Sequence, residues 1–206
     1  FTTSDGVHHT VWTLNDPAQW VALFEKVPAA YIADGHHRAA AAARVALDRR
    51  ATQPGGPTGR ESYNGFLGVL FPAGQLQVLP YHRIVRDLNG MEPGESLDAV
   101  QDRFDVRPAV SGVPAGPGRI HLYVADAWHV LQWRPSSKAD PVEALDVSVL
   151  HDRLLTPILG IGDPRNNPRI EFLGGRTGAE RIKRQVDTGA AAAGFALHPV
   201  TPQQIM

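Results

Sequence analysis

Residues 119–133, which read RIHLYVADAWHVLQW, carry the strongest local signal for the fold. Two runs rich in β-branched and aromatic residues, 119–125 and 128–133, flank the turn candidate Asp126-Ala127. Runs of this kind separated by two residues are typical of a β-hairpin, because a tight turn returns the second strand directly onto the first. The stretch therefore predicts two neighbouring antiparallel strands.

Outside this hairpin, predicted strands and helices alternate along the chain. A further hairpin is predicted from 64–71 and 76–85, around a turn at 72–75. Hairpins combined with strand–helix units indicate an α+β fold, with a mixed sheet and flanking helices. The predicted helices are 18–27, 36–50, 95–104, 142–161 and 178–188, and the predicted single strands are 7–14, 30–33, 106–110, 169–173 and 194–200.

The length of 206 residues fits one domain, because domains hold roughly 100–200 residues. We therefore predict a single α+β domain over 1–206, with a candidate internal boundary at the loop 111–118, which is rich in Pro and Gly. The chain begins at Phe1 within a polar stretch, and we interpret it as a fragment of a longer protein.

The composition excludes several classes of protein. Apolar residues make up 43% of the chain and charged residues 20%, which is enough to bury a core. The net charge of −1 argues against a nucleic-acid or membrane partner, since both require a positive field. The absence of cysteine excludes disulfides, Cys-ligated zinc and thiol nucleophiles. No apolar run approaches the ~20 residues that span a bilayer. We expect a cytoplasmic protein, and its oligomeric state, a homo-oligomer included, stays open.

The stretch 31–38, YIADGHHR, holds the sharpest candidate site. A short buried strand is expected to end at a tight turn that leads directly into the helix beginning at His36. The first turn of a helix has unpaired N–H groups and a partial positive charge, which together favour an anion. Gly35 allows a ligand to approach the backbone closely, and Arg38 can donate two hydrogen bonds to its oxygens. His36 and His37 can donate hydrogen bonds or transfer a proton.

Asp34 has several candidate roles at this turn. It can orient a histidine tautomer, bind a ribose hydroxyl or contact a metal. The plainer alternative is that Asp34 only caps the helix and that His36 and His37 are solvated residues of its first turn. A second constellation, His82-Arg83 near the end of a predicted hairpin strand, can form another cationic clamp on the same phosphate. Its alternative is an edge strand with ordinary polar residues.

No resident metal site is predicted. His36 and His37 are adjacent, whereas two histidines on one helix share a face at a spacing of three or four residues. A zinc site built from distant histidines is an alternative. A magnesium ion that arrives with a nucleotide needs fewer ligands from the protein. The segment 174–178, GGRTG, is interpreted as a tight turn before a helix, with an anion-binding loop as its alternative.

The motif IADGHHR at 32–38 resembles the signature of the family called domain of unknown function 1015. Further stretches that fit this family in the same order are GVHHTVW at 6–12, LPYHRIV at 79–85, LDVSVLH at 145–151 and FALHP at 195–199. Members of that family are longer, which agrees with a fragment. One departure is Ala39, where the family usually has an aromatic residue.

The string DGHHR is also similar to the phosphate-binding motif of the ParB/sulfiredoxin-like superfamily, which includes free serine kinases. This resemblance implies a ParB/sulfiredoxin-like element around the turn, with an ATP, ADP or CTP ligand and its Mg²⁺. His36 stands where sulfiredoxin-like proteins have their reactive cysteine, so peroxide repair by a thiol is excluded.

These observations lead to one hypothesis and two alternatives. The hypothesis is that the chain binds the phosphates of a nucleotide or phospho-metabolite and transfers a phosphoryl group to a small, serine-like molecule. The alternatives are a non-catalytic nucleotide-binding or interaction module and a histidine-based, metal-dependent hydrolase. The candidate catalytic residues are His36, His37 and Asp34, and the candidate phosphate-binding residues are Gly35, Arg38, His82 and Arg83.

Overall fold

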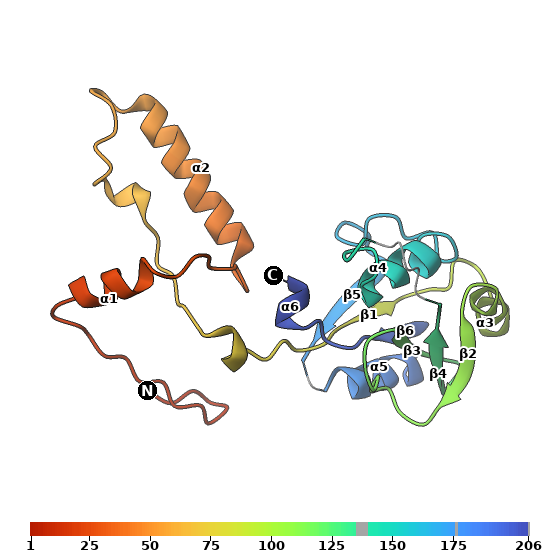
Figure 1. Ribbon diagram of the computed structural model, residues 1–206. Helices are drawn as coiled ribbons and strands as arrows, with labels where there is room; N and C mark the ends of the chain where they lie inside the picture. Colours follow the sequence, from red (N-terminus) through yellow and green to blue (C-terminus); the bar gives the residue numbers. More distant parts are fainter. Residues whose placement is uncertain (135–139, 176, 206) are drawn as a thin grey trace. The chain divides into compact units, whose positions relative to one another are not determined.

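The computed structural model describes residues 1–134, 140–175 and 177–205 (Figure 1). The chain divides into two compact units, Phe1–Val69 and Leu70–Met206, and each is described by itself. The loop 111–118 lies within the second unit, so the division falls elsewhere in the chain than the boundary we expected. Folding as one domain stays a prediction. Within the described residues, no helix is both long enough and apolar enough to cross a membrane.

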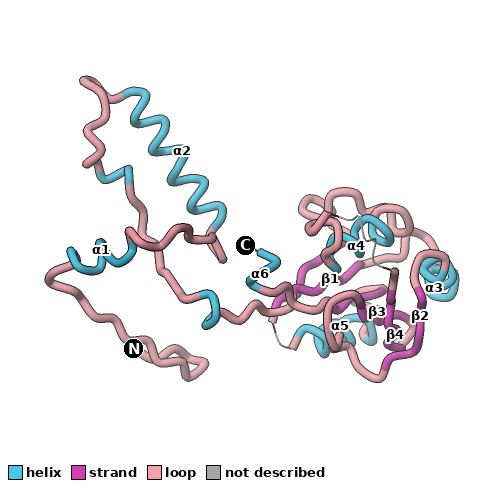
Figure 2. Tube along the Cα trace, viewed as in Figure 1, coloured by secondary structure: helices cyan, strands magenta, loops and turns pink. Residues whose placement is uncertain are grey.

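The second unit is built on a six-stranded sheet with the order β2-β4-β3-β6-β1-β5 (Figures 1 and 2). Together with the helices that cover this sheet, it confirms the α+β fold class. The strands are β1 Tyr81–Val85, β2 Asp105–Ala109, β3 Arg119–Val124, β4 Ala127–Gln132, β5 Ile170–Gly174 and β6 Ala193–Ala196.

The hairpin predicted from 119–133 is confirmed as β3 and β4. Val124 pairs with Ala127, so the loop between the strands is Ala125-Asp126, one residue earlier than expected. Both loop residues have positive φ, 48° and 59°, as a type I′ turn requires. This turn matches the twist of the two strands and explains why the local sequence is sufficient to predict them.

The expectation of a mixed sheet is wrong. Every strand pairing among the described residues is antiparallel. A strand–helix–strand unit such as β5-α5-β6, with α5 at Gly178–Asp187, often joins two parallel strands. Strand β1 lies between β5 and β6 and pairs antiparallel with both. The two strands thus run parallel to each other without being hydrogen-bonded neighbours, which local sequence does not reveal.

The other predicted hairpin, 64–71 with 76–85, is wrong. Only Tyr81–Val85 forms a strand, and its partners β5 and β6 come from the far end of the chain. These partners bury Ile84 and Val85 on opposite faces of the sheet, to 1% and 0% exposure. A local hairpin offers no comparable burial, and Leu67 remains 93% exposed.

Two apolar layers lie on the two faces of this sheet. The larger layer packs α3, Pro93–Gln101, and α4, Asp146–Leu150, against strand residues that include Val85. The smaller layer packs Ile182 of α5 against Ile84 and its neighbours. A π-helical turn, His151–Leu155, continues α4, and α6, Pro202–Ile205, follows β6. The predicted helix 142–161 therefore forms only over part of its length.

The first unit contains helices but no strand. Its helices are α1, Ala18–Phe24, and α2, His36–Thr52, followed by a short 3₁₀ turn at Ser62–Asn64. The strands expected at 7–14 and 30–33 are wrong: across the fully described stretch 1–69, a single bridge between Thr2 and His8 forms. A strand needs a neighbour for its N–H and C=O groups, and this unit supplies none. No residue of 1–69 is buried.

We expect Gly178→Ala to lower the free energy of unfolding by about 1–3 kcal/mol, since the added methyl overpacks the core. A Cβ at Gly178 would overlap Cδ2 of the buried His82. The measurement is urea unfolding of the parent chain, of Gly178→Ala and of a control variant. Gly94→Ala in α3 is the matched control, because its Cβ meets no atom within 4 Å. An unchanged stability of Gly178→Ala would contradict this packing.

Candidate functional site

The DGHHR turn lies at the start of α2, a helix of 17 residues. Gly35 occupies the N-cap with φ 83° and ψ 24°, in the left-handed region that favours glycine. No side chain caps the helix and no acidic residue lies in its first turn. In the part of the chain that the structure describes, the N–H groups of His36, His37 and Arg38 make no hydrogen bond. The turn thus offers several donors to an anion.

Asp34 does not cap the helix, in contrast to the plainer alternative from sequence. Its Oδ2 accepts a hydrogen bond from Nη2 of Arg38 at 3.2 Å. The two side chains are 94% and 82% exposed, so water screens this ion pair and it contributes little to stability. The Arg38 guanidinium lies over the turn, since a Cβ on Gly35 would be 3.2 Å from its Nη2. The motif therefore places its cation beside its free N–H groups.

His36 and His37 are both exposed, and they point apart because successive helical residues differ by about 100°. The strand expected before them at 30–33 is absent, and Tyr31 and Ile32 are exposed. Four arginines and one aspartate lie along α2, so the helix has an excess of positive charge. Both imidazoles are accessible to a ligand at the turn.

In the second unit, His82 and Arg83 are neighbours on β1 and face opposite sides of the sheet. His82 is 4% exposed, and its Nδ1 accepts a hydrogen bond from the Leu197 N–H at 3.1 Å. Burial, together with the nearby charge of Arg83, lowers the pKa of His82 to about 4. His82 is therefore neutral at pH 7 and holds the backbone after β6. The two side chains do not share one cavity, and phosphate binding by either stays a prediction.

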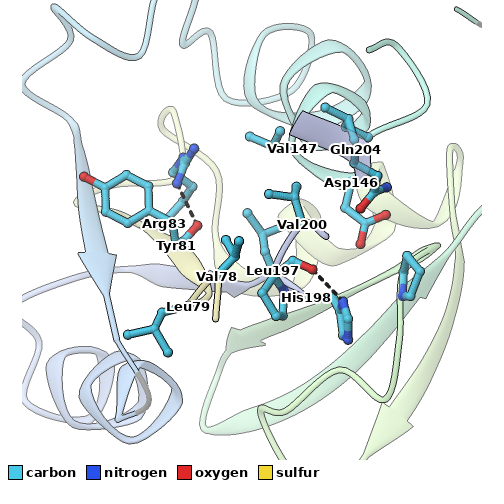
Figure 3. A pocket seen from close by; sticks show the side chains of 13 residues that line it. Val78, Leu79, Tyr81, Arg83, Asp146, Val147, Leu197, His198, Val200 and Gln204 are labelled. Atoms are coloured by element: carbon cyan, nitrogen blue, oxygen red, sulfur yellow. Dashed lines mark hydrogen bonds between the residues drawn. The ribbon is translucent and has the colours of Figure 1, made fainter. Parts of the chain in front are cut away.

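Arg83 lines a pocket of about 220 Å³ in the second unit (Figure 3). Its Nη1 donates to the carbonyl oxygens of Tyr81 and His82 at 2.8 and 3.3 Å. Its Cζ lies 4.4 Å from the ring centroid of Phe172 and 5.1 Å from that of Tyr81. Burial lowers the pKa of Arg83 to about 10, an effect that Tyr81 opposes. The guanidinium therefore stays charged at pH 7.

The same pocket contains Asp146 and His198, which the sequence reasoning missed as site residues. Oδ1 of Asp146 accepts the Gly118 N–H at 2.8 Å. Burial raises the pKa of Asp146, and the hydrogen bond from Gly118 opposes that rise. Nδ1 of His198 donates to the carbonyl of Pro199 at 2.9 Å. Both residues fall in stretches that resemble the family, 145–151 and 195–199, and this is the signal that could have found them.

No metal centre is evident in the ranges that the structure describes. Among the described residues, no group of three or more His, Asp or Glu is arranged to hold a metal ion. Thr177 is the N-cap of α5, but Arg176 lies outside the described residues, so the interpretation of 174–178, GGRTG, as a tight turn stays a prediction.

The family model described as "Protein of unknown function (DUF1015)" matches residues 1–148 of the 206, and the chain belongs to this family. The matched region includes the DGHHR turn, Arg83 and Asp146. No curated protein and no solved structure matches the chain. The likeness of the turn to the ParB/sulfiredoxin-like superfamily stays a prediction.

We expect the chain to lose stability as the pH falls through the window between the unfolded and folded pKa of His82, 6.5 and about 4. Because the unfolded imidazole takes up a proton first, stability is fully present above this window. A shift of this size corresponds to about 3 kcal/mol. The measurement is the free energy of unfolding across that pH range.

The test of this assignment is His82→Asn, whose Oδ1 can still accept the Leu197 N–H but does not titrate. We expect its stability to depend less on pH than that of the parent chain. His9→Asn, at an exposed histidine, should keep the parental slope. An equal slope in the parent chain and in His82→Asn would contradict a role for His82 in the pH dependence.

Proposed function

We propose that this chain binds the phosphate groups of a nucleotide or phospho-metabolite at the DGHHR turn. The observation that carries the proposal is the start of α2, where the N–H groups of His36, His37 and Arg38 have no partner among the described residues. A helix of this length adds a partial positive charge at the same place. The similarity of DGHHR to the phosphate-binding motif of free serine kinases supports the same ligand class.

In this proposal, each group of the turn makes a different contact with the ligand. The free N–H groups and the Arg38 guanidinium contact phosphate oxygens, and Gly35 allows the ligand close to the backbone. Arg38 exchanges Asp34 for phosphate at little cost, since their ion pair is exposed. Asp34 is then free to orient a histidine or to contact the Mg²⁺ that an ATP, ADP or CTP ligand carries.

The proposed chemistry is phosphoryl transfer to or from a small, serine-like molecule in the cytoplasm. Phosphoryl transfer depends mainly on positioning and on charge stabilisation, which suit an arginine, imidazoles and a helix start. His36 or His37 donates a hydrogen bond or a proton to the oxygen that develops charge. His82 and Arg83, first expected as a second clamp, are not needed for this step.

The second candidate is a module that binds the same ligand without turnover. The exposure of Asp34, His36, His37 and Arg38 favours it, because transfer requires a site that excludes water from the reacting groups. Both candidates predict binding at the turn, and only the first predicts release of ADP that depends on the acceptor molecule.

We expect Arg38→Gln to weaken binding of Mg²⁺-ATP about ten- to a hundredfold, as is typical when one hydrogen bond to a charged group is lost. The measurement is titration calorimetry of the full chain with ATP, ADP and CTP, combined with a coupled assay of ADP release in the presence of serine. Binding without ADP release supports the module, and release that Arg38→Gln abolishes supports the transferase.

The matched control is Arg44→Gln, an exposed arginine six residues further along the same helix. It removes the same charge from α2 but lies away from the turn, so nucleotide binding should remain. Equal losses in both variants would mean that the charge of the helix, and not the turn, attracts the ligand. No binding of nucleotide or phosphate by the parent chain would contradict both candidates.

A further inference from the structure

The pocket in the second unit has a cation on one side and a carboxylate on the other. In Figure 3 Arg83 and Asp146 lie on either side of it, with Val147 and Val200 between them. At about 220 Å³ the pocket is smaller than those that hold drug-sized molecules. Its dimensions and its two opposite charges restrict what can fill it.

Arg83 has the features of a built anion site. It is 9% exposed, and among the described residues it has no carboxylate partner, which is unusual for a buried charge. Two backbone carbonyls accept from Nη1, while Nε and Nη2 make no hydrogen bond within the described chain. The rings of Tyr81 and Phe172 hold the guanidinium in place. These two remaining donors can grip a carboxylate in a bidentate manner.

Asp146 offers a hydrogen-bond acceptor and a negative charge, whereas Arg83 offers donors and a positive charge. One of its oxygens accepts the Gly118 N–H, and its Oδ2 makes no hydrogen bond in the described part of the chain. The side chain is half-buried, and no lysine or arginine pairs with it there. A carboxylate in such a place is stabilised by a cationic donor. His198, in the same pocket, lowers the pKa of Asp146 by its charge but forms no ion pair with it within the described chain, so Oδ2 remains open to a stronger cation.

Apolar side chains line the pocket between the Arg83 guanidinium and the Asp146 carboxylate. Side chains that line the space include Leu145, Val147, Leu197 and Val200. A phosphate dianion held by Arg83 would face the Asp146 carboxylate in the same small pocket and would be repelled. A molecule with one negative end, an aliphatic body and one positive end would match all three surfaces.

We propose that this pocket binds a small aliphatic zwitterion, whose carboxylate contacts Arg83 and whose ammonium group contacts Asp146. The site is distinct from the DGHHR turn, which belongs to the first unit, and the proposal does not rest on phosphate binding there. It changes the role expected for Arg83 from a phosphate clamp to carboxylate recognition.

The test is titration calorimetry of the full chain with zwitterions that differ in the separation of their charges: glycine, 4-aminobutyrate and 6-aminohexanoate. Butyrate, butylammonium and inorganic phosphate are the probes with one kind of charge. We expect at least one zwitterion to bind about tenfold more tightly than each of these, because it alone satisfies both side chains. The best chain length then reports the spacing of the two groups.

Two variants separate the contributions of the charges. Arg83→Met keeps an apolar stem against Tyr81 and Phe172, and Asp146→Asn keeps an oxygen for the Gly118 N–H. Each should weaken binding of the best zwitterion about tenfold or more. Should Arg83→Met fail to fold, Asp146→Asn carries the test alone. The controls Arg107→Met and Asp105→Asn, at an exposed ion pair on β2, should leave binding unchanged, as should Arg38→Gln.

Three outcomes would overturn the proposal. The first is that no zwitterion binds the parent chain at millimolar concentration. The second is that butyrate or phosphate binds as tightly as the best zwitterion and Asp146→Asn has no effect, which would leave a simple anion site at Arg83. The third is that Arg107→Met or Asp105→Asn weakens binding as much as the pocket variants do. Because these outcomes do not involve Arg38, they leave phosphate binding at the turn untouched.

Discussion

The second unit depends on the antiparallel pairing of β1 with both β5 and β6. This pairing buries the last four residues of β1, His82–Val85, with segments that are distant in sequence, while Tyr81 stays exposed. Since side chains alternate along a strand, it directs His82 and Ile84 toward α5 and Arg83 and Val85 toward the other face. One face of β1 thus closes a core against Gly178, and the other supplies the cation of the pocket.

This arrangement explains how two adjacent polar residues come to have unrelated roles. His82 is kept neutral by burial and serves as an acceptor for the Leu197 N–H. Arg83 keeps its charge, because two carbonyls and two aromatic rings compensate part of the lost hydration. A buried cation without a carboxylate partner carries a desolvation cost, and a ligand that supplies the missing charge would offset it.

The two candidate sites are formed by different kinds of interaction. At the DGHHR turn, the donors come from backbone geometry, namely a left-handed Gly35 and the uncapped start of α2, and no residue around them is buried. In the pocket of the second unit, the polar groups are few and partly desolvated, and packing between remote segments holds them. We propose a highly charged phosphate group as the ligand of the first site and a small molecule with balanced charge as the ligand of the second.

Local sequence was sufficient for the β3-β4 hairpin and for helices α2 and α5, since turn geometry and helix propensity act over a few residues. It also located the DGHHR turn, whose donors are those of any helix start. Tertiary structure alone decided three features: the partners of β1, the absence of strands at 7–14 and 30–33, and the position of Arg83 and Asp146 in one pocket. Pairing and burial join segments far apart in the chain, and no local pattern records which distant segment satisfies a strand's hydrogen bonds or faces a buried charge.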